Sequence, residues 1–123
     1  MTRKFYFDTY ALVEISKSNP KYSPYREGVN ILLNKLNILE FCYFLLTEGK
    51  RNYAKEIFKL FSKFNVDYDE EMLLNAAEMK LTFLKQRLSF VDCIGYNLAK
   101  KHGAKFLTGD EAFRDKENVE FVK

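Results

Sequence analysis

The chain has 123 residues, 47% of them hydrophobic, with a formal net charge of +3 and a pI of about 8.8. This length suits one compact domain with a substantial core and argues against two, so we expect a single domain over residues 1–123. The mild basic excess is compatible with a polyanionic partner, but it is far from a histone-like composition and predicts no partner by itself.

Cysteine spacing and hydropathy exclude further classes. Cys42 and Cys93 fit no metal-ligand spacing, so we expect two reduced, buried thiols and no zinc site. The N-terminal residues lack the apolar region of a signal peptide, and no apolar run approaches the roughly 18 residues that a membrane span requires. The sequence therefore predicts a cytoplasmic protein without a membrane partner.

Short strands alternate with helices along the chain. Residues 4–7 form a predicted strand that stops at Asp8, and residues 9–18 have the apolar spacing of a helix, before Pro20 and Pro24 break the chain. The later elements continue this order: strand 28–34, helices 36–46 and 52–64, strand 65–68, helices 70–87 and 89–103, strand 104–108, a helical turn within 109–118, and strand 119–122. Because parallel strands need crossovers of a dozen or more residues, we predict a three-layer α/β fold, with about five parallel strands and helices on both faces.

Four acids fall where such a fold would gather them. Asp8 directly follows the first strand, and Asp110 follows the fourth. Asp92 lies in the first turn of the helix that leads into the fourth strand, and Glu40 lies in the first half of the helix after the second strand. Ligands of open parallel sheets bind beyond the carboxyl ends of the strands, so we expect the four carboxylates to converge at that edge.

Three of these acids, taken singly, have a simpler explanation. Asp8 and Asp110 precede helical segments, and Asp is a favoured N-cap residue. Asp92 follows Ser89 at the spacing of a capping box. Capping is the more economical interpretation of each, and only their convergence favours a functional one.

Glu40 needs another explanation because it lies in the apolar run LNILEFCYFLL. On a helix its neighbours one turn away are Leu36, Tyr43 and Phe44, so its carboxylate is expected on the apolar face, where an unpaired charge costs several kcal/mol. A mid-helix residue has no free N–H groups to cap. The alternatives are a salt bridge to a lysine and a place in a metal-binding cluster.

The four acids together favour a metal site. Clustered carboxylates repel one another unless a cation offsets their charge. Oxygen ligands without His or Cys select Mg²⁺ or Mn²⁺, which commonly act on phosphate esters. His102 is the sole histidine, so a pair of catalytic histidines is excluded.

The sequence also resembles a known family, the PIN domain, and specifically the small VapC-like toxin ribonucleases. The resemblance covers nearly the whole chain and rests on FYFDTYAL, LNILEFCYFLL and SFVDCIGYNLAKKHGAKFLTGDEAF. Carried over by position, the acidic quartet of the family falls on Asp8, Glu40, Asp92 and Asp110. The resemblance implies that these acids are catalytic and bind the metal.

The family further implies a Rossmann-like sheet, Mg²⁺- or Mn²⁺-dependent endoribonuclease activity on RNA, a homodimer, and inhibition by a small antitoxin protein. Thr108 matches a hydroxyl residue found near the last acids, where it would position water or substrate. Asp115 is a further acid of lower rank, because it lies a turn away from the motif.

A basic stripe offers a candidate RNA contact. Arg51, Lys55, Lys59 and Lys63 recur every four residues on one predicted helix face. A solvated face is the usual meaning of such a run. Like charges at this spacing nevertheless destabilise a helix by roughly 0.2–0.5 kcal/mol per pair, and an RNA backbone would relieve that repulsion.

Two other functions compete with a nuclease. A PIN domain without nuclease activity could act as a scaffold that binds RNA or protein, although its four acids would then be unexplained. Receiver-type phosphoacceptor domains have a similar length and element order, but they carry paired acids after the first strand. Here that strand ends in the single acid Asp8.

Overall fold

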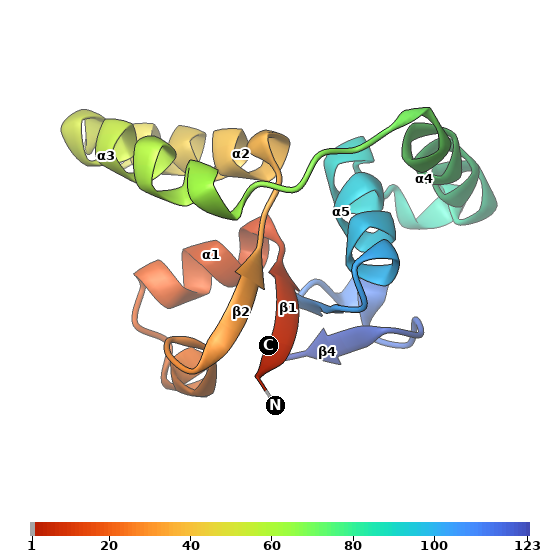
Figure 1. The fold of residues 1–123 in the computed structure, drawn as a ribbon, viewed down its shortest axis with the longest axis horizontal. Coiled ribbons are helices and arrows are strands. Elements are labelled where there is room, and N and C mark those ends of the chain that lie inside the picture. The colour runs from red at the N-terminus through yellow and green to blue at the C-terminus, as the bar shows by residue number, and fades with distance from the viewer. Residues whose placement is uncertain (1) are drawn as a thin grey trace.

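The fold is built on one parallel sheet, described here from a computed structural model of residues 2–123; Met1, the first residue of the predicted domain, lies outside this range. The strands lie in the spatial order β2-β1-β3-β4, and every neighbouring pair is parallel (Figure 1). Their bounds are β1 (Arg3–Phe7), β2 (Val29–Leu32), β3 (Lys105–Thr108) and β4 (Val119–Phe121). All four therefore end at the same edge of the sheet.

Helices connect the strands and lie to both sides of the sheet (Figure 1). The α-helices are α1 (Thr9–Ser16), α2 (Lys35–Thr47), α3 (Arg51–Phe61), α4 (Glu70–Thr82) and α5 (Phe90–Lys101). Short 3₁₀ segments complete the chain: η1 (Pro20–Tyr25), η2 (Ser62–Phe64), η3 (Leu84–Gln86) and η4 (Glu111–Phe113). No helix within residues 2–123 is long and apolar enough to cross a membrane.

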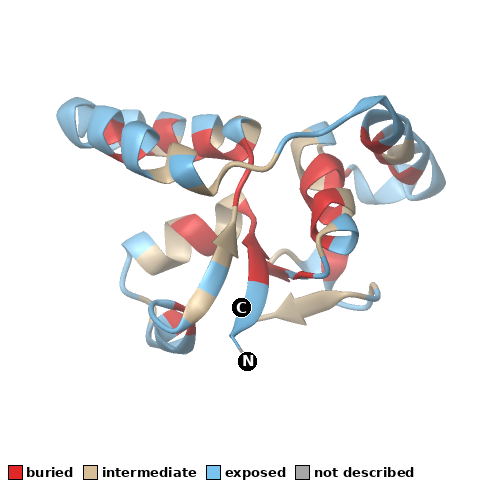
Figure 2. Cartoon of the chain, viewed as in Figure 1, coloured by how far each residue is buried: buried red, intermediate tan, exposed pale blue. Residues whose placement is uncertain are grey.

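A hydrophobic core covers each face of the sheet. Successive strand residues point to opposite faces, so Phe5 and Phe7 pack with α1, α2 and α3, whereas Tyr6 packs with α4 and α5. Figure 2 shows the buried residues on the central strand β1 and on the inner sides of the helices, with intermediate residues on β2 and β4 and exposed residues on the outer sides of α3 and α4. The predicted α/β class with helices on both faces is confirmed.

The prediction of about five strands is wrong, because residues 65–68 form no strand. Asn65 makes a single isolated bridge with Leu33 and then leaves the sheet. Its side chain instead accepts a hydrogen bond from the backbone N–H of Lys35 at 2.9 Å and donates one to Asp67 at 2.9 Å. The contact with Asp67 is local, and local polar contacts compete with a strand ladder. The segment then crosses over to α4.

Candidate active site

The fold brings the four predicted acids to the carboxyl edge of the sheet. Asp8 is the first residue after β1, and Asp110 is the second after β3. Asp92 lies in the first turn of α5, and Glu40 lies in the second turn of α2. Figure 1 shows that α2 and α5 both begin on the side of the sheet where β1 and β2 end.

Asp8 is the most deeply buried of these acids. Only 3% of its surface is exposed. Its Oδ1 caps α1 by accepting a hydrogen bond from the Ala11 N–H at 2.8 Å, and the Thr108 side chain also donates to it. Burial nevertheless raises the pKa of Asp8 to about 8, and the nearby charges of Asp92 and Asp110 act in the same direction. The Asp8 carboxyl therefore holds a proton at neutral pH.

Asp92 shares this poorly hydrated environment. Burial raises its pKa to about 6, the charges of Glu40 and Asp110 add to the rise, and the Ser89 side chain opposes it. Ser89 caps α5 as the sequence predicts, by accepting a hydrogen bond from the Asp92 backbone N–H at 3.0 Å. Mutual electrostatic effects therefore connect all four acids into one cluster.

Glu40 has a partner that the sequence analysis did not consider. Thr9 Oγ1 donates a hydrogen bond to its Oε1 at 2.6 Å. Glu40 is half-buried and lies beside the fully buried face of α2, which carries Ile38 and Phe41; Tyr43 is 69% exposed. In the described part of the chain Glu40 forms no ion pair, so of the two alternatives the salt bridge to a lysine is not what stabilises it.

The capping explanation is correct for two of the three aspartates, Asp8 and Asp110. Asp8 caps α1, and Asp110 Oδ1 caps η4 by accepting from the Ala112 N–H at 3.0 Å. Each capping bond uses one carboxylate oxygen, so it does not exclude a second role. The caps account for the local structure, but they do not account for the clustering of four like charges.

The four acids supply the type of ligand atom that a hard divalent cation prefers. The cluster offers carboxylate oxygens from Asp8, Glu40, Asp92 and Asp110, which suit Mg²⁺ or Mn²⁺. Among residues 2–123, however, no three Asp, Glu, His or Cys side chains are close enough together to hold one ion. The acids are thus gathered at one edge without forming a closed coordination shell.

Thr108 lies beneath the acids. It is fully buried, and its Oγ1 accepts a hydrogen bond from the Asp110 N–H at 3.0 Å while its hydroxyl donates to Asp8. These contacts suit a residue that orients two acids. A direct contact with substrate, as the resemblance implied, would require the buried hydroxyl to become exposed.

The basic stripe is exposed but separate from the acids. Its members lie on α3 and η2, and none forms an ion pair among the described residues. None of these cations is among the groups that shift the pKa of Asp8 or Asp92. The stripe consists of Arg51, Lys55, Lys59 and Lys63.

Sequence reasoning missed three residues that surround the cluster. Thr9 binds Glu40, and the Tyr6 hydroxyl donates to Asn37 Oδ1 at 3.1 Å. Tyr6 and Asn37 are each 1% exposed. The available signal was Asn37 itself, a polar residue in an apolar run one turn before Glu40.

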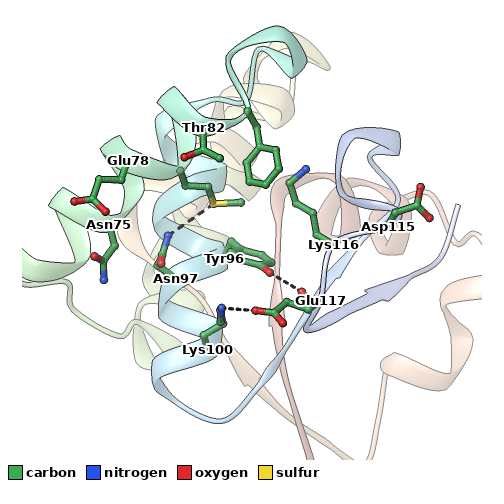
Figure 3. A pocket seen from close by; sticks show the side chains of 11 residues that line it. Asn75, Glu78, Thr82, Tyr96, Asn97, Lys100, Asp115, Lys116 and Glu117 are labelled. Atoms are coloured by element: carbon green, nitrogen blue, oxygen red, sulfur yellow. Dashed lines mark hydrogen bonds and ion pairs between the residues drawn. The ribbon is translucent and has the colours of Figure 1, made fainter.

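A hollow lies elsewhere on the molecule, between α4, α5 and residues 115–117 (Figure 3). Its volume is about 540 Å³, and none of the four clustered acids lines it. Its rim carries charges of both signs, including the exposed Asp115 and the ion pair between Lys100 and Glu117 at 2.9 Å. Asp115 lines this groove and so belongs to a different part of the surface.

Comparison with known proteins now establishes the family. A family model of the PIN domain matches residues 5–119, so the chain belongs to the PIN domain family. No curated protein matches the sequence significantly.

Several solved structures share the fold. A structure described as a toxin-antitoxin complex from Klebsiella pneumoniae matches with 14% identity over 94% of each chain and a TM-score of 0.72. PAE2754 from Pyrobaculum aerophilum matches with 20% identity over 99% of this chain and 92% of that one, with a TM-score of 0.66. VapBC2 from Rickettsia felis, bound to a DNA fragment from its promoter, matches with 15% identity over 97% of each chain and a TM-score of 0.69.

The raised pKa of Asp8 predicts a pH-dependent stability of the metal-free protein. The folded state keeps a proton that the unfolded chain loses above about pH 4, so the free energy of unfolding should fall as the pH rises to about 8. Since one pKa unit corresponds to about 1.4 kcal/mol, we expect a loss of more than about 1 kcal/mol between roughly pH 5 and pH 8. Urea unfolding in EDTA measures this slope.

Asp8→Asn should remove most of that slope. The matched control is Asp115→Asn, which removes an exposed carboxylate from outside the cluster and should leave the slope unchanged. A wild-type stability that stays constant or rises over this pH range would show that the Asp8 carboxyl is ionised in the folded protein.

Proposed function

We propose that the chain is a metal-dependent endoribonuclease that hydrolyses RNA phosphodiester bonds. The main support for this proposal is the convergence of four carboxylates at one edge of the sheet, where burial and mutual repulsion raise the pKa of Asp8 and Asp92. Such a cluster is unfavourable on its own, and a divalent cation is what would compensate it. Membership of the PIN domain family supports the same conclusion.

The proposed metal ligands are Asp8, Glu40, Asp92 and Asp110. When bound, Mg²⁺ or Mn²⁺ would activate water and neutralise charge on the phosphodiester. Thr9 holds the Glu40 carboxylate through its 2.6 Å hydrogen bond.

No histidine is available as the general base. His102, the C-cap residue of α5, follows Asp92 by ten positions, which is about 15 Å along a helix. Proton transfer at the site therefore falls to the acids.

Toxin activity and its partners form a second part of the proposal. Two of the similar structures are named as a toxin-antitoxin complex and as VapBC2. By analogy, we assign this chain a cytoplasmic toxin role with a small antitoxin partner and a homodimeric state. The alternative, a PIN scaffold without nuclease activity, is decided by the cleavage experiment below.

The basic stripe is the proposed contact for the RNA backbone. Its four cations are exposed, have no carboxylate partner among the described residues, and repel one another along α3 and η2. Phosphate groups of RNA would offset that repulsion and release counterions on binding.

The purified protein should cleave RNA with Mg²⁺ or Mn²⁺ and should not cleave it in EDTA, because its oxygen ligands require a hard cation. Asp8→Asn and Glu40→Gln should each abolish cleavage. Thermal unfolding should show that wild type gains about 2.7 kcal/mol at a hundredfold excess of Mn²⁺ over its dissociation constant, and Glu40→Gln clearly less. In EDTA, Glu40→Gln should be at least as stable as wild type, because it removes a repelling charge.

The matched control is Glu48→Gln, which removes an exposed carboxylate at the end of the same helix. It should keep both cleavage and the Mn²⁺ response. Cleavage that persists in EDTA and in Asp8→Asn would contradict the proposal, and binding of RNA without cleavage under any metal condition would favour the scaffold.

Charge reversal in the stripe should weaken RNA binding. We expect Lys55→Glu/Lys59→Glu to lower affinity and to reduce the slope of log affinity against log salt by at least about 1, because each phosphate contact to a single strand contributes roughly 0.7. Fluorescence anisotropy with a labelled single-stranded RNA in EDTA measures both quantities without cleavage.

The control Lys21→Glu/Lys105→Glu makes the same charge change outside the stripe. Lys21 lies on η1, and Lys105 is the first residue of β3, at the edge of the sheet opposite the acids. It should affect affinity and slope much less. Equal effects of the two double variants would reduce the stripe to a solvated helix face.

A further inference from the structure

Two buried side chains connect the elements that carry three of the acids. The Tyr6 hydroxyl donates a hydrogen bond to Asn37 Oδ1 at 3.1 Å, and both residues are 1% exposed. Tyr6 belongs to β1, and Asn37 lies in the first turn of α2. We call this contact the Tyr6–Asn37 bridge.

The Asn37 amide has several well-defined partners. Its Oδ1 accepts from the Asn34 backbone N–H at 2.8 Å as well as from Tyr6, and its Nδ2 donates to the Phe7 carbonyl at 2.7 Å. Phe7 directly precedes Asp8, and Asn37 lies one turn before Glu40. One side chain therefore connects the start of α2 to the end of β1, beside an acid on each element.

The ring of Tyr6 makes the corresponding contact with α5. A Cβ atom on Gly95 would lie 2.5 Å from Tyr6 Cε1 and 2.8 Å from its Cζ, so only glycine leaves room for the ring. Gly95 lies one turn after Asp92. Burial raises the pKa of the Tyr6 hydroxyl, and the nearby charges of Asp8, Asp92 and Glu40 raise it further.

The Tyr6–Asn37 bridge lies close to two acids that repel each other. Asp92 on α5 and Glu40 on α2 repel each other, and this force tends to separate the two helices. The bridge joins β1 to α2 one turn before Glu40, and the ring of Tyr6 packs against α5 one turn after Asp92. A buried hydrogen bond that only satisfied its own donor and acceptor would not need to lie so close to the helices that carry these acids.

We propose that Tyr6 and Asn37 are positioning residues that fix the distance between α2 and α5, and hence the spacing of the carboxylates that a divalent cation must join. This inference rests on the proposed function, and it adds two residues that never touch the cation. Groups that are hydrogen-bonded directly to metal ligands change metal affinity or activity by roughly 10–100-fold when removed. Tyr6 and Asn37 contact the elements that carry the acids instead of the acids themselves, so we expect an effect at the lower end of this range.

Tyr6→Phe is the sharpest test, because it keeps the ring against Gly95 and deletes only the hydroxyl. Titration calorimetry with Mn²⁺ alone should show about tenfold weaker binding, and kcat for RNA should fall at least about tenfold with KM little changed. Circular dichroism in EDTA should show a folded protein. Gly95→Ala, which displaces the ring instead, should weaken Mn²⁺ binding in the same direction.

Tyr96→Phe is the matched control. Tyr96 is a buried tyrosine on α5 whose hydroxyl donates to the Glu117 carbonyl at 2.6 Å (Figure 3). None of the four acids is among the charges that shift its pKa. Its loss should lower the melting temperature and leave Mn²⁺ affinity unchanged.

The outcomes separate the two levels of the proposal. Wild type that binds no Mn²⁺ would overturn the proposed function, and the positioning role would fall with it. Wild-type binding that Tyr6→Phe and Gly95→Ala both retain would overturn the positioning role alone. Equal weakening in Tyr6→Phe and Tyr96→Phe would also overturn it, because the effect would then come from general loss of stability.

Discussion

The cost of an ionised carboxylate away from water is the constraint on which the rest of the site depends. Asp8 lies at the end of β1 with 3% of its surface exposed, and burial is the largest cause of its raised pKa. The Ala11 N–H and the Thr108 side chain stabilise the charge, whereas Asp92 and Asp110 oppose it. The outcome is a carboxyl that carries a proton at neutral pH and can exchange it for a cation.

The parallel sheet explains why this cost arises at one place. Its four strands end at the same edge, and the helices that carry Glu40 and Asp92 begin near it. Helix N-termini favour negative charge, so the first turn of α5 partly offsets the repulsion at Asp92. The Tyr6–Asn37 bridge joins β1 to α2, and the ring of Tyr6 packs against Gly95 of α5. Local caps, helix ends and buried hydrogen bonds thus act on the same small group of charges.

The sequence predicted what local patterns determine. The alternation of predicted strands and helices gave the α/β class and the placement of Asp8 and Asp110 at strand ends. The spacing of Ser89 and Asp92 gave the cap of α5. Such patterns did not predict the partner of Glu40 or the Tyr6–Asn37 bridge, because both join residues 31 positions apart. Residues 65–68 failed as a strand for a related reason: their pattern did not reveal that Asn65 would bond to Asp67 nearby and to Lys35, which lies 30 positions away. Side-chain pairing across the fold is not encoded in periodicity.

The most direct test of this account is the number of protons released when Mn²⁺ binds. Titration calorimetry at about pH 7 in two buffers of different ionisation enthalpy measures this number, because ligands must lose their protons before they bind a metal. With the pKa of Asp8 near 8 and that of Asp92 near 6, binding should release close to one proton per chain, and Asp8→Asn should release far less. Tight Mn²⁺ binding by wild type without proton release would contradict the account, because the acids would then be ionised already and the strain attributed to their burial would not exist.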